Sequence, residues 1–429
     1  MLANFFKLQE NHTTIKTEII AGFTTFLTMA YIIIVNPAIL QETGMDHGAV
    51  FVATCLAASL ATAIMGLYAN YPVALAPGMG LNAYFTYSVS LGMGLGWQTA
   101  LGIVFISGVI CVLLSLLPIR EYIINSIPHS LKMAIASGIG LFLGIIALKN
   151  AGFIVADPAT FVTLGKLTSI TCILAAIGFF LMVALDNYRI PGSIIISILV
   201  ITFIGMILGV SPVTNSFFSL PPSLAPTFLK MDLMGAIMSG AAIIFAFVFV
   251  DLFDTAGTLI GVAHQANMLD KDGKLPRLKQ ALVADSSASI IGSMLGTSST
   301  TSYIESAAGV RAGGRTGLTA IVVSLLFLAA LFFSPLAKAV PIYAAAPALL
   351  FVACLMTKGL TQIDWNDGTE YGPAVVTALA MPLTFSIANG IALGFISYVC
   401  IKLLSGRFKE LNPILIILSI LFCVRFATI

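Results

Sequence analysis

Long hydrophobic runs alternate with short polar segments along almost the whole chain. Apolar runs of about 18 residues or more are long enough to cross a bilayer as helices, and they recur from Ile19 onward. The pattern predicts an all-α polytopic membrane protein with fourteen transmembrane spans, at 19–40, 48–69, 73–91, 97–117, 130–148, 168–186, 190–209, 233–260, 281–295, 297–310, 316–335, 343–358, 371–385 and 388–404. The C-terminal segment, 405–429, ends in a short apolar stretch that contains Arg425, so its relation to the membrane is left open.

A polar connection at 210–232 separates seven spans from seven. Two halves with an odd number of spans must insert in opposite orientations, which is typical of an inverted repeat. We therefore expect a first repeat at 19–209, a crossover loop at 210–232 and a second repeat at 233–404, after an N-terminal segment at 1–18.

The third span of each half is interrupted. The first interruption is "APGMG", with Pro77, Gly78 and Gly80, and the second is a run of seven small or hydroxylated residues from Gly296 to Ser302. A broken helix frees backbone N–H and C=O groups, which are tolerated at membrane depth only where protein, ligand or a wet cavity satisfies them. Breaks at matching positions of two halves therefore predict a transporter's binding site between them.

Composition and charge support a membrane protein and give its orientation. The chain is 59% hydrophobic and only 9% charged, with a mean hydropathy of +1.05, which excludes an ordinary soluble domain. With the N-terminus inside, fifteen of the 20 lysines and arginines lie in inner segments and four in outer loops, with Arg425 unassigned. The positive-inside rule therefore predicts a multi-pass protein of the cell inner membrane with a cytoplasmic N-terminus.

Four carboxylates lie within the predicted spans, away from their ends: Asp251, Asp254, Asp285 and Glu305. No lysine or arginine lies within the eighth, ninth or tenth span. Acids buried without a cation favour the protonated form, which suits proton coupling. The missing cation also argues against an anionic substrate. It favours a flat neutral molecule with N–H donors and ring acceptors, which carboxylates, Asn82 and free backbone groups could bind.

Structural roles for two of these acids stay open at this point. Asp285 could tie the broken helices together through neighbouring serine and threonine side chains. Asp251 could lie near the cytoplasmic end of its span and be partly solvated. The four scattered histidines offer no paired ligands, so we expect no metal, no cofactor and no intramembrane enzyme. The net charge of +2 gives no reason to expect a nucleic-acid partner.

Several segments together resemble the AzgA-like purine permeases, a branch of the nucleobase–cation symporter family that also includes uracil and xanthine permeases. The segments are "AGFTTFLTMAYIIIVNP" (21–37), "APGMGLNAYF" (76–85), "FVDLFDTAGTLIG" (249–261), "GTSSTTSYIESAAGV" (296–310) and "GGRTGLTA" (313–320). The resemblance extends over about 7–420, nearly the whole chain.

This resemblance implies two inverted seven-span repeats in which spans 3 and 10 contain short strands. A core domain would comprise 19–117 plus 233–335, and a gate domain 130–209 plus 343–404. Substrate would bind between them and cross by alternating access. The implied partners are a purine nucleobase (adenine, guanine or hypoxanthine), a proton and the lipid bilayer, while a homodimer is left open. A uracil or xanthine permease and an anion exchanger of the same architecture are the alternatives.

The resemblance also implies roles for particular residues. The substrate-binding candidates are Asp254, Glu305, Asn82, Thr255, Gly80 and Thr300, and the proton-coupling candidates are Glu305, Asp254 and Asp251. Either Asp254 or Asp251 could correspond to the substrate-binding acid of the eighth span. Asp285 is expected to support the site without touching the base.

Overall fold

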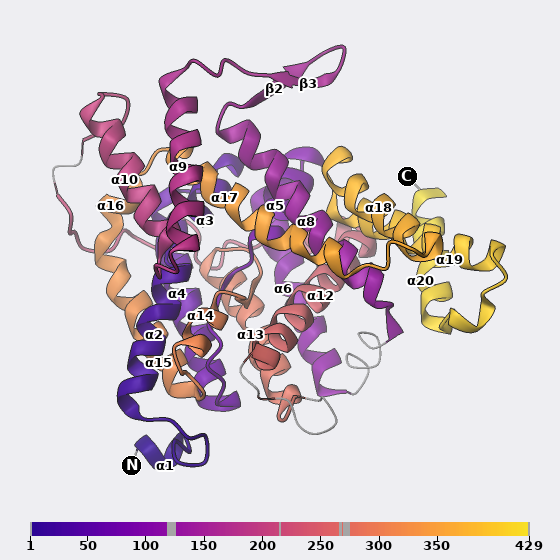
Figure 1. Ribbon diagram of the computed structural model, residues 1–429, viewed down its shortest axis with the longest axis horizontal. Helices are drawn as coiled ribbons and strands as arrows, with labels where there is room; N and C mark the ends of the chain where they lie inside the picture. Colours follow the sequence, from indigo (N-terminus) through magenta and orange to yellow (C-terminus); the bar gives the residue numbers. More distant parts are fainter. Residues whose placement is uncertain (1, 118–125, 214–215, 266–267, 269–274, 428–429) are drawn as a thin grey trace.

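The computed structural model describes residues 2–117, 126–213, 216–265, 268 and 275–427, and the chain there is mostly helical (Figure 1). Arg120, Lys271 and Lys274, three of the cations behind the predicted orientation, lie outside the described residues.

The first half of the chain contains nine α-helices, two π-helical segments, one 3₁₀ turn and three strands within its described residues. They are α1 (Leu2–Phe5), α2 (Ile15–Met29), α3 (Ile32–Leu40), η1 (Gln41–Thr43), α4 (His47–Ile64), η2 (Met65–Ala69), β1 (Leu75–Pro77), α5 (Met79–Ala83), η3 (Tyr84–Gly92), α6 (Trp97–Leu116), α8 (His129–Asn150), β2 (Ile154–Asp157), β3 (Phe161–Leu164), α9 (Ile170–Asn187) and α10 (Ser193–Ile207).

The second half follows after the crossover loop. Its described elements are α11 (Leu233–Met238), α12 (Ala241–Gln265), α13 (Leu278–Leu295), β4 (Thr300–Ser302), α14 (Ser306–Arg311), α15 (Gly317–Ala330), η4 (Leu331–Phe333), α16 (Ser334–Ala339), α17 (Ile342–Thr357), η5 (Lys358–Gln362), α18 (Gly368–Leu383), α19 (Ile387–Leu404), η6 (Phe408–Glu410) and α20 (Pro413–Ala427).

Eight helical segments within the described part of the chain are long and apolar enough to cross a membrane. They are Ile15–Thr43, His47–Ala69, Trp97–Leu116, His129–Asn150, Ile170–Asn187, Gly317–Ala339, Ile342–Gln362 and Ile387–Leu404. A polytopic membrane protein is therefore supported by length and composition. The count of fourteen spans and the inverted repeat stay predictions.

The helices pack in two groups. One group contains α2, α4, α6, α12, α13, α14 and α15, and the other contains α8, α9, α10, α17, α18 and α19. In Figure 1, α18 and α19 lie at one end of the longest axis and α2 and α15 lie toward the other. The strands β1 and β4 belong to the first group, since β1 contacts α4 and β4 contacts α12 and α13.

The two predicted interruptions meet as a two-stranded antiparallel sheet. Leu75 pairs with Ser302, Ala76 with Thr301 and Pro77 with Thr300. On its other edge, the backbone of Leu75 is satisfied by Thr62, whose hydroxyl lies 3.0 Å from the Leu75 carbonyl oxygen and 2.9 Å from its nitrogen. Buried backbone groups need such partners. The prediction of short strands in spans 3 and 10 is confirmed.

Other features were not anticipated from the sequence. The predicted first span is divided at Ala30–Tyr31, between α2 and α3. The predicted eighth span is divided at Gly240, whose positive φ of 102° favours glycine because it lacks a Cβ. The segment between α8 and α9, for which the sequence pattern predicted no element, forms the β2–β3 hairpin that projects from the body in Figure 1.

The C-terminal helix α20 runs back along α19. The Ser419 hydroxyl donates to the Phe395 carbonyl oxygen at 3.1 Å, and Arg425 Nη2 lies 3.5 Å from Asn389 Oδ1. Before the helix, buried Lys402 binds Glu370 at 2.5 Å and also Glu410, which fixes the returning chain. The Phe422 ring lies 6.1 Å from the Phe249 ring of α12 and 5.9 Å from the Phe395 ring, so α20 contacts both helix groups.

Candidate functional site

The site is built where the two broken spans join. The Gly78 amide donates to the Ser299 carbonyl oxygen at 2.9 Å, and the Tyr303 amide donates to the Ala74 carbonyl oxygen at the same distance. The Tyr303 hydroxyl donates to the Pro77 carbonyl oxygen at 2.6 Å. These bonds make the two interruptions a single rigid unit against which the acids of α12 and α13 are placed.

Asp285 of α13 lies at the centre of this unit and is fully buried. Its Oδ1 accepts hydrogen bonds from the Ser302 amide at 2.8 Å and the Ser302 hydroxyl at 2.7 Å, and its Oδ2 accepts one from the Thr255 hydroxyl at 2.5 Å. Asp285 therefore ties α12 and β4 to α13. Hydrogen bonds to a carboxylate are stronger than those between neutral groups, so this arrangement holds β4 in place.

Asp251 of α12 is also buried, with 2% of its surface exposed. Its Oδ1 accepts a hydrogen bond from the Ser299 hydroxyl at 3.0 Å. The structure thus places Asp251 inside the first helix group, and a half-solvated position near the cytoplasmic end of the span is ruled out.

Asp254, three residues later on the same helix, is in a different environment. Its side chain is partly exposed, and neither a hydrogen bond nor an ion pair to it is found among the residues that the structure describes. A Cβ built on Gly78 would lie 3.5 Å from Asp254 Oδ2, so the carboxylate faces the break in the third span. Asp251 and Asp285 bond Ser299 and Ser302 of the joined break, and Glu305 follows three residues after Ser302, so the four acids form one cluster around the two breaks.

Glu305 immediately precedes α14 and is also partly exposed. The Tyr31 hydroxyl donates to its Oε1 at 2.7 Å, and the Thr28 hydroxyl lies 3.4 Å from its backbone carbonyl oxygen. The sequence pattern did not identify Tyr31 as a partner of Glu305. The signal that could have identified it is a tyrosine in the middle of an apolar span, because a buried hydroxyl usually has a hydrogen-bond partner.

Asn82 and Gly80 lie at the start of the helix after β1. Asn82 is fully buried, and its Oδ1 accepts a hydrogen bond from Ser298, while its Nδ2 has no hydrogen-bond partner in the described part of the chain. A Cβ on Gly80 would lie 2.6 Å from Ile139 Cγ2 of α8, so the two helix groups approach closely here.

Thr255 and Thr300 are both buried. Besides Asp285, the Thr255 hydroxyl lies 3.1 Å from the Thr301 hydroxyl. The Thr300 hydroxyl would lie 2.6 Å from a Cβ on Gly292, so it points toward α13. In this conformation the Thr255 hydroxyl bonds Asp285, whereas the buried Thr300 hydroxyl has no hydrogen-bond partner among the described residues.

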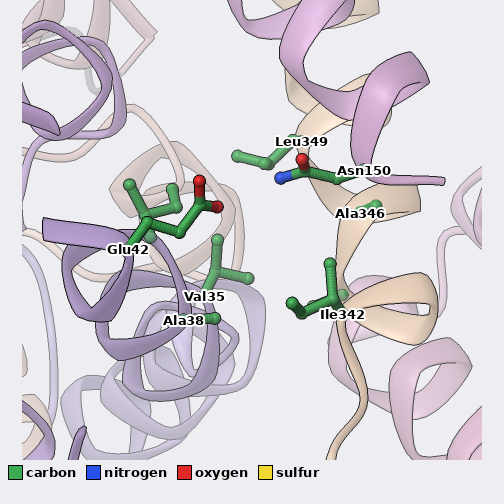
Figure 2. A pocket seen from close by; sticks show the side chains of 9 residues that line it. Val35, Ala38, Glu42, Asn150, Ile342, Ala346 and Leu349 are labelled. Atoms are coloured by element: carbon green, nitrogen blue, oxygen red, sulfur yellow. The ribbon is translucent and has the colours of Figure 1, made fainter. Parts of the chain in front are cut away.

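A separate hollow lies between α3 and η1 on one side and α17 and the end of α8 on the other (Figure 2). Val35, Ala38, Ile342, Ala346 and Leu349 form apolar walls, and Glu42 and Asn150 face one another across it. Tyr87 connects the two sides, because its hydroxyl lies 2.8 Å from Glu42 Oε1 and 3.5 Å from Asn150 Nδ2. None of the four acids of the cluster lines this hollow.

The joined breaks, the buried acid cluster and the apolar helices around them define a membrane transport protein. The chain belongs to the permease family Xan_ur_permease, which matches residues 16–393. The predicted resemblance to nucleobase permeases is thereby confirmed. Among its relatives is the adenine permease AdeP of Escherichia coli K12, 51% identical over 99% of this chain and 96% of the relative. Another is the guanine/hypoxanthine permease PbuO of Bacillus subtilis 168, 44% identical over 98% and 99%.

The fold is similar to the transmembrane domain of the cyanobacterial bicarbonate transporter BicA. The TM-score is 0.68 at 14% identity, over 87% of this chain and 97% of that domain. At that identity the likeness establishes the fold and does not extend to the substrate. Like its relatives, the chain is a transmembrane permease and not an enzyme.

Proposed function

We propose that this permease imports purine nucleobases, namely adenine, guanine or hypoxanthine, by proton symport. Its relatives carry purine names, with AdeP named for adenine and PbuO for guanine and hypoxanthine. In this proposal the base binds at the joined breaks of the third and tenth spans, within the inner membrane of the cell, and the N-terminus is cytoplasmic.

The observation that carries the proposal is the partial exposure of the Asp254 and Glu305 carboxylates. Both carboxylates are partly exposed, and no cation pairs with either one in the described ranges of the chain. A purine presents several N–H groups along one edge, and carboxylate oxygens are strong acceptors for them. Asp254 and Glu305 would bind these N–H groups, and the buried Nδ2 of Asn82, near the same break, would donate to a ring nitrogen after a small rearrangement.

The same acids support proton coupling. An acid that binds a proton at depth and releases it to one side of the membrane can couple transport to the proton gradient. Glu305 and Asp254 are the preferred carriers because they are the accessible pair, and Asp251 is the reserve candidate. Asp285 supports the site through its bonds to Thr255 and Ser302.

Alternating access would follow from movement between the two helix groups, which we assign to the proposed core and gate domains. The groups contact one another beside the site, where Gly80 lies against Ile139, and also where the Ser88 hydroxyl donates to the Phe385 carbonyl oxygen at 2.6 Å. Each contact is small enough to be broken and remade during a transport cycle.

An anion exchanger is the rival that the fold suggests, but the chemistry of the site disfavours it. An anionic substrate placed beside Asp254 and Glu305 would meet like charge without a compensating cation. A uracil or xanthine permease is the closer rival, because those bases also present N–H donors to carboxylates.

Uptake assays in a host that lacks its own nucleobase permeases test the proposal. Radiolabelled adenine, guanine, hypoxanthine, xanthine and uracil would be supplied with and without a protonophore. We expect accumulation of at least one of the first three bases, abolished by the protonophore. Uptake of uracil or xanthine alone would overturn the assignment to adenine, guanine or hypoxanthine, and accumulation that survives the protonophore would overturn symport.

A further inference from the structure

We propose that Tyr31 is a positioning residue that orients Glu305 for the nucleobase, an inference that rests on the proposed function. Tyr31 is 1% exposed and donates its hydroxyl to Glu305 Oε1 at 2.7 Å. Within the described residues, no other side chain donates a hydrogen bond to the Glu305 carboxylate, which is partly exposed and so can meet a ligand. Tyr31 fixes one oxygen of the carboxylate and leaves the other for an N–H group of the base.

The break in the first span makes this contact. Tyr31 lies between the end of α2 at Met29 and the start of α3 at Ile32. The preceding turn also contacts Glu305, since the Thr28 hydroxyl lies 3.4 Å from its carbonyl oxygen. One turn of the first span therefore lies against both the backbone and the side chain of Glu305, although Tyr31 and Glu305 are separated by 274 residues.

Orientation matters because a glutamate side chain has several rotatable bonds. Ordering a flexible side chain at the moment of binding weakens the binding, and a group ordered in advance avoids that loss. The Tyr31 hydroxyl is the only polar atom of its side chain, so its removal tests this role with little change in shape.

Tyr31→Phe removes the donor and keeps the ring. We expect the KM for the transported purine to rise roughly tenfold, as for the loss of one hydrogen bond to a charged group. The maximal rate per transporter should stay close to that of the unmodified protein. Initial uptake rates over a range of base concentrations, normalised to the amount of protein in the membrane, give both values.

Tyr84→Phe is the matched control. Tyr84 is also fully buried, and its hydroxyl has no hydrogen-bond partner among described residues, so the same chemical change should leave the KM unaltered. A Tyr31→Phe protein with a KM within twofold of the original would overturn the inference. So would a fall in membrane abundance with an unchanged KM, because that would show a purely structural role.

The inference and the proposed function fail in different ways. If Glu305→Gln abolishes uptake while Tyr31→Phe leaves the KM unchanged, only the positioning role is lost. If Glu305→Gln transports normally, the proposed site itself is wrong.

Discussion

Helix α12 carries two aspartates that are three residues apart yet lie in different environments. Asp251 is 2% exposed and accepts a hydrogen bond from Ser299, whereas Asp254 is partly exposed and has no such partner among the residues described. The other two acids divide in the same way, because Asp285 is buried among donors and Glu305 is partly exposed. The cluster therefore contains a buried pair and an accessible pair.

The division has a simple geometric cause. Residues three apart on a helix differ by about 60° around its axis, so one can face the packed interior while the other faces a gap. A charged residue at membrane depth can therefore serve structure or binding. A structural role is indicated where hydrogen-bond donors lie within reach of the carboxylate, and a binding role where the carboxylate is left exposed. The following variants test whether the pairs differ in role as they differ in environment.

The largest expected effect is that of Glu305→Gln in the accessible pair. The amide has nearly the same shape but loses the charge, so purine uptake should fall about a hundredfold or more, as when one partner of a buried charged contact is removed. Uptake of radiolabelled base at matched membrane abundance measures the loss. Glu10→Gln is the control. Glu10 forms an exposed ion pair with Lys7 at 3.2 Å, so this variant should transport normally. Normal accumulation by Glu305→Gln would remove Glu305 from its role.

Asp254→Asn is expected to have the next largest effect. Its carboxylate has no hydrogen bond from the described residues, so its loss should leave folding intact and reduce purine affinity about tenfold or more. Titrating the purified protein with the base measures the change in affinity. Lower abundance with unchanged affinity would instead place Asp254 with the buried pair.

Asp285→Asn should act mainly on stability. The amide NH₂ would face donors from Thr255 and Ser302, and a buried donor without an acceptor costs about 1–3 kcal/mol. We expect a lower unfolding temperature in detergent and several-fold less protein in the membrane, with the remaining molecules still active. Lost transport at normal abundance would contradict this assignment and give the buried pair a direct role.

Gly80→Ala tests the contact between the two helix groups beside the acids. The new Cβ would lie 2.6 Å from Ile139 Cγ2, so closure should be disfavoured and uptake should fall several-fold. The double variant Gly80→Ala, Ile139→Ala should recover much of the loss because it removes the clashing methyl group. Gly372→Ala in α18 is the control, since its nearest neighbour would be Ile401 Cδ1 at 3.6 Å, an ordinary contact. No recovery in the double variant would show that Gly80 acts by another route.

The smallest effect is expected from an acid outside the predicted spans. The Thr369 amide above all, with the Thr369 hydroxyl and Arg407, lowers the pKa of Asp367 from 3.8 to about 2. A lowered folded-state pKa stabilises the protein above the unfolded value, and that contribution is lost as the pH falls from about 4 toward 2. Uptake by Asp367→Asn between pH 5 and 8 should therefore follow the same pH profile as the original. A shifted profile would mean that proton coupling involves more than the membrane acids.

Much of this organisation could be predicted from the sequence because it depends on local chemistry. Pro77, Gly78 and Gly80 in the third span, and the serines and threonines after Gly296 in the tenth, disfavour a continuous helix wherever they occur. The four acids were found because they are rare in apolar spans. The strands at both breaks followed from the family resemblance and are present as β1 and β4.

Other features could not be predicted because they depend on distant segments. Thr255 and Thr300 were candidates for touching the base, yet their hydroxyls face Asp285 and α13. The contact between Tyr31 and Glu305 joins the first span to the tenth. The path of α20 along α19 is accompanied by contacts with distant residues, such as the bond of Ser419 to Phe395, and no periodicity of the apolar stretch itself contains that information.

The sequence by itself determined the membrane environment, the places where the helices break and the positions of the acids within the apolar spans. These features follow from hydropathy and backbone preference, which are properties of short segments. The tertiary structure alone decided which acids are covered and which can meet a ligand. The orientation of a helix about its own axis is fixed only when its neighbours pack against it. For α12 those neighbours include Ser299, Thr301 and Asp285, contributed by β4 and α13 and the turn between them.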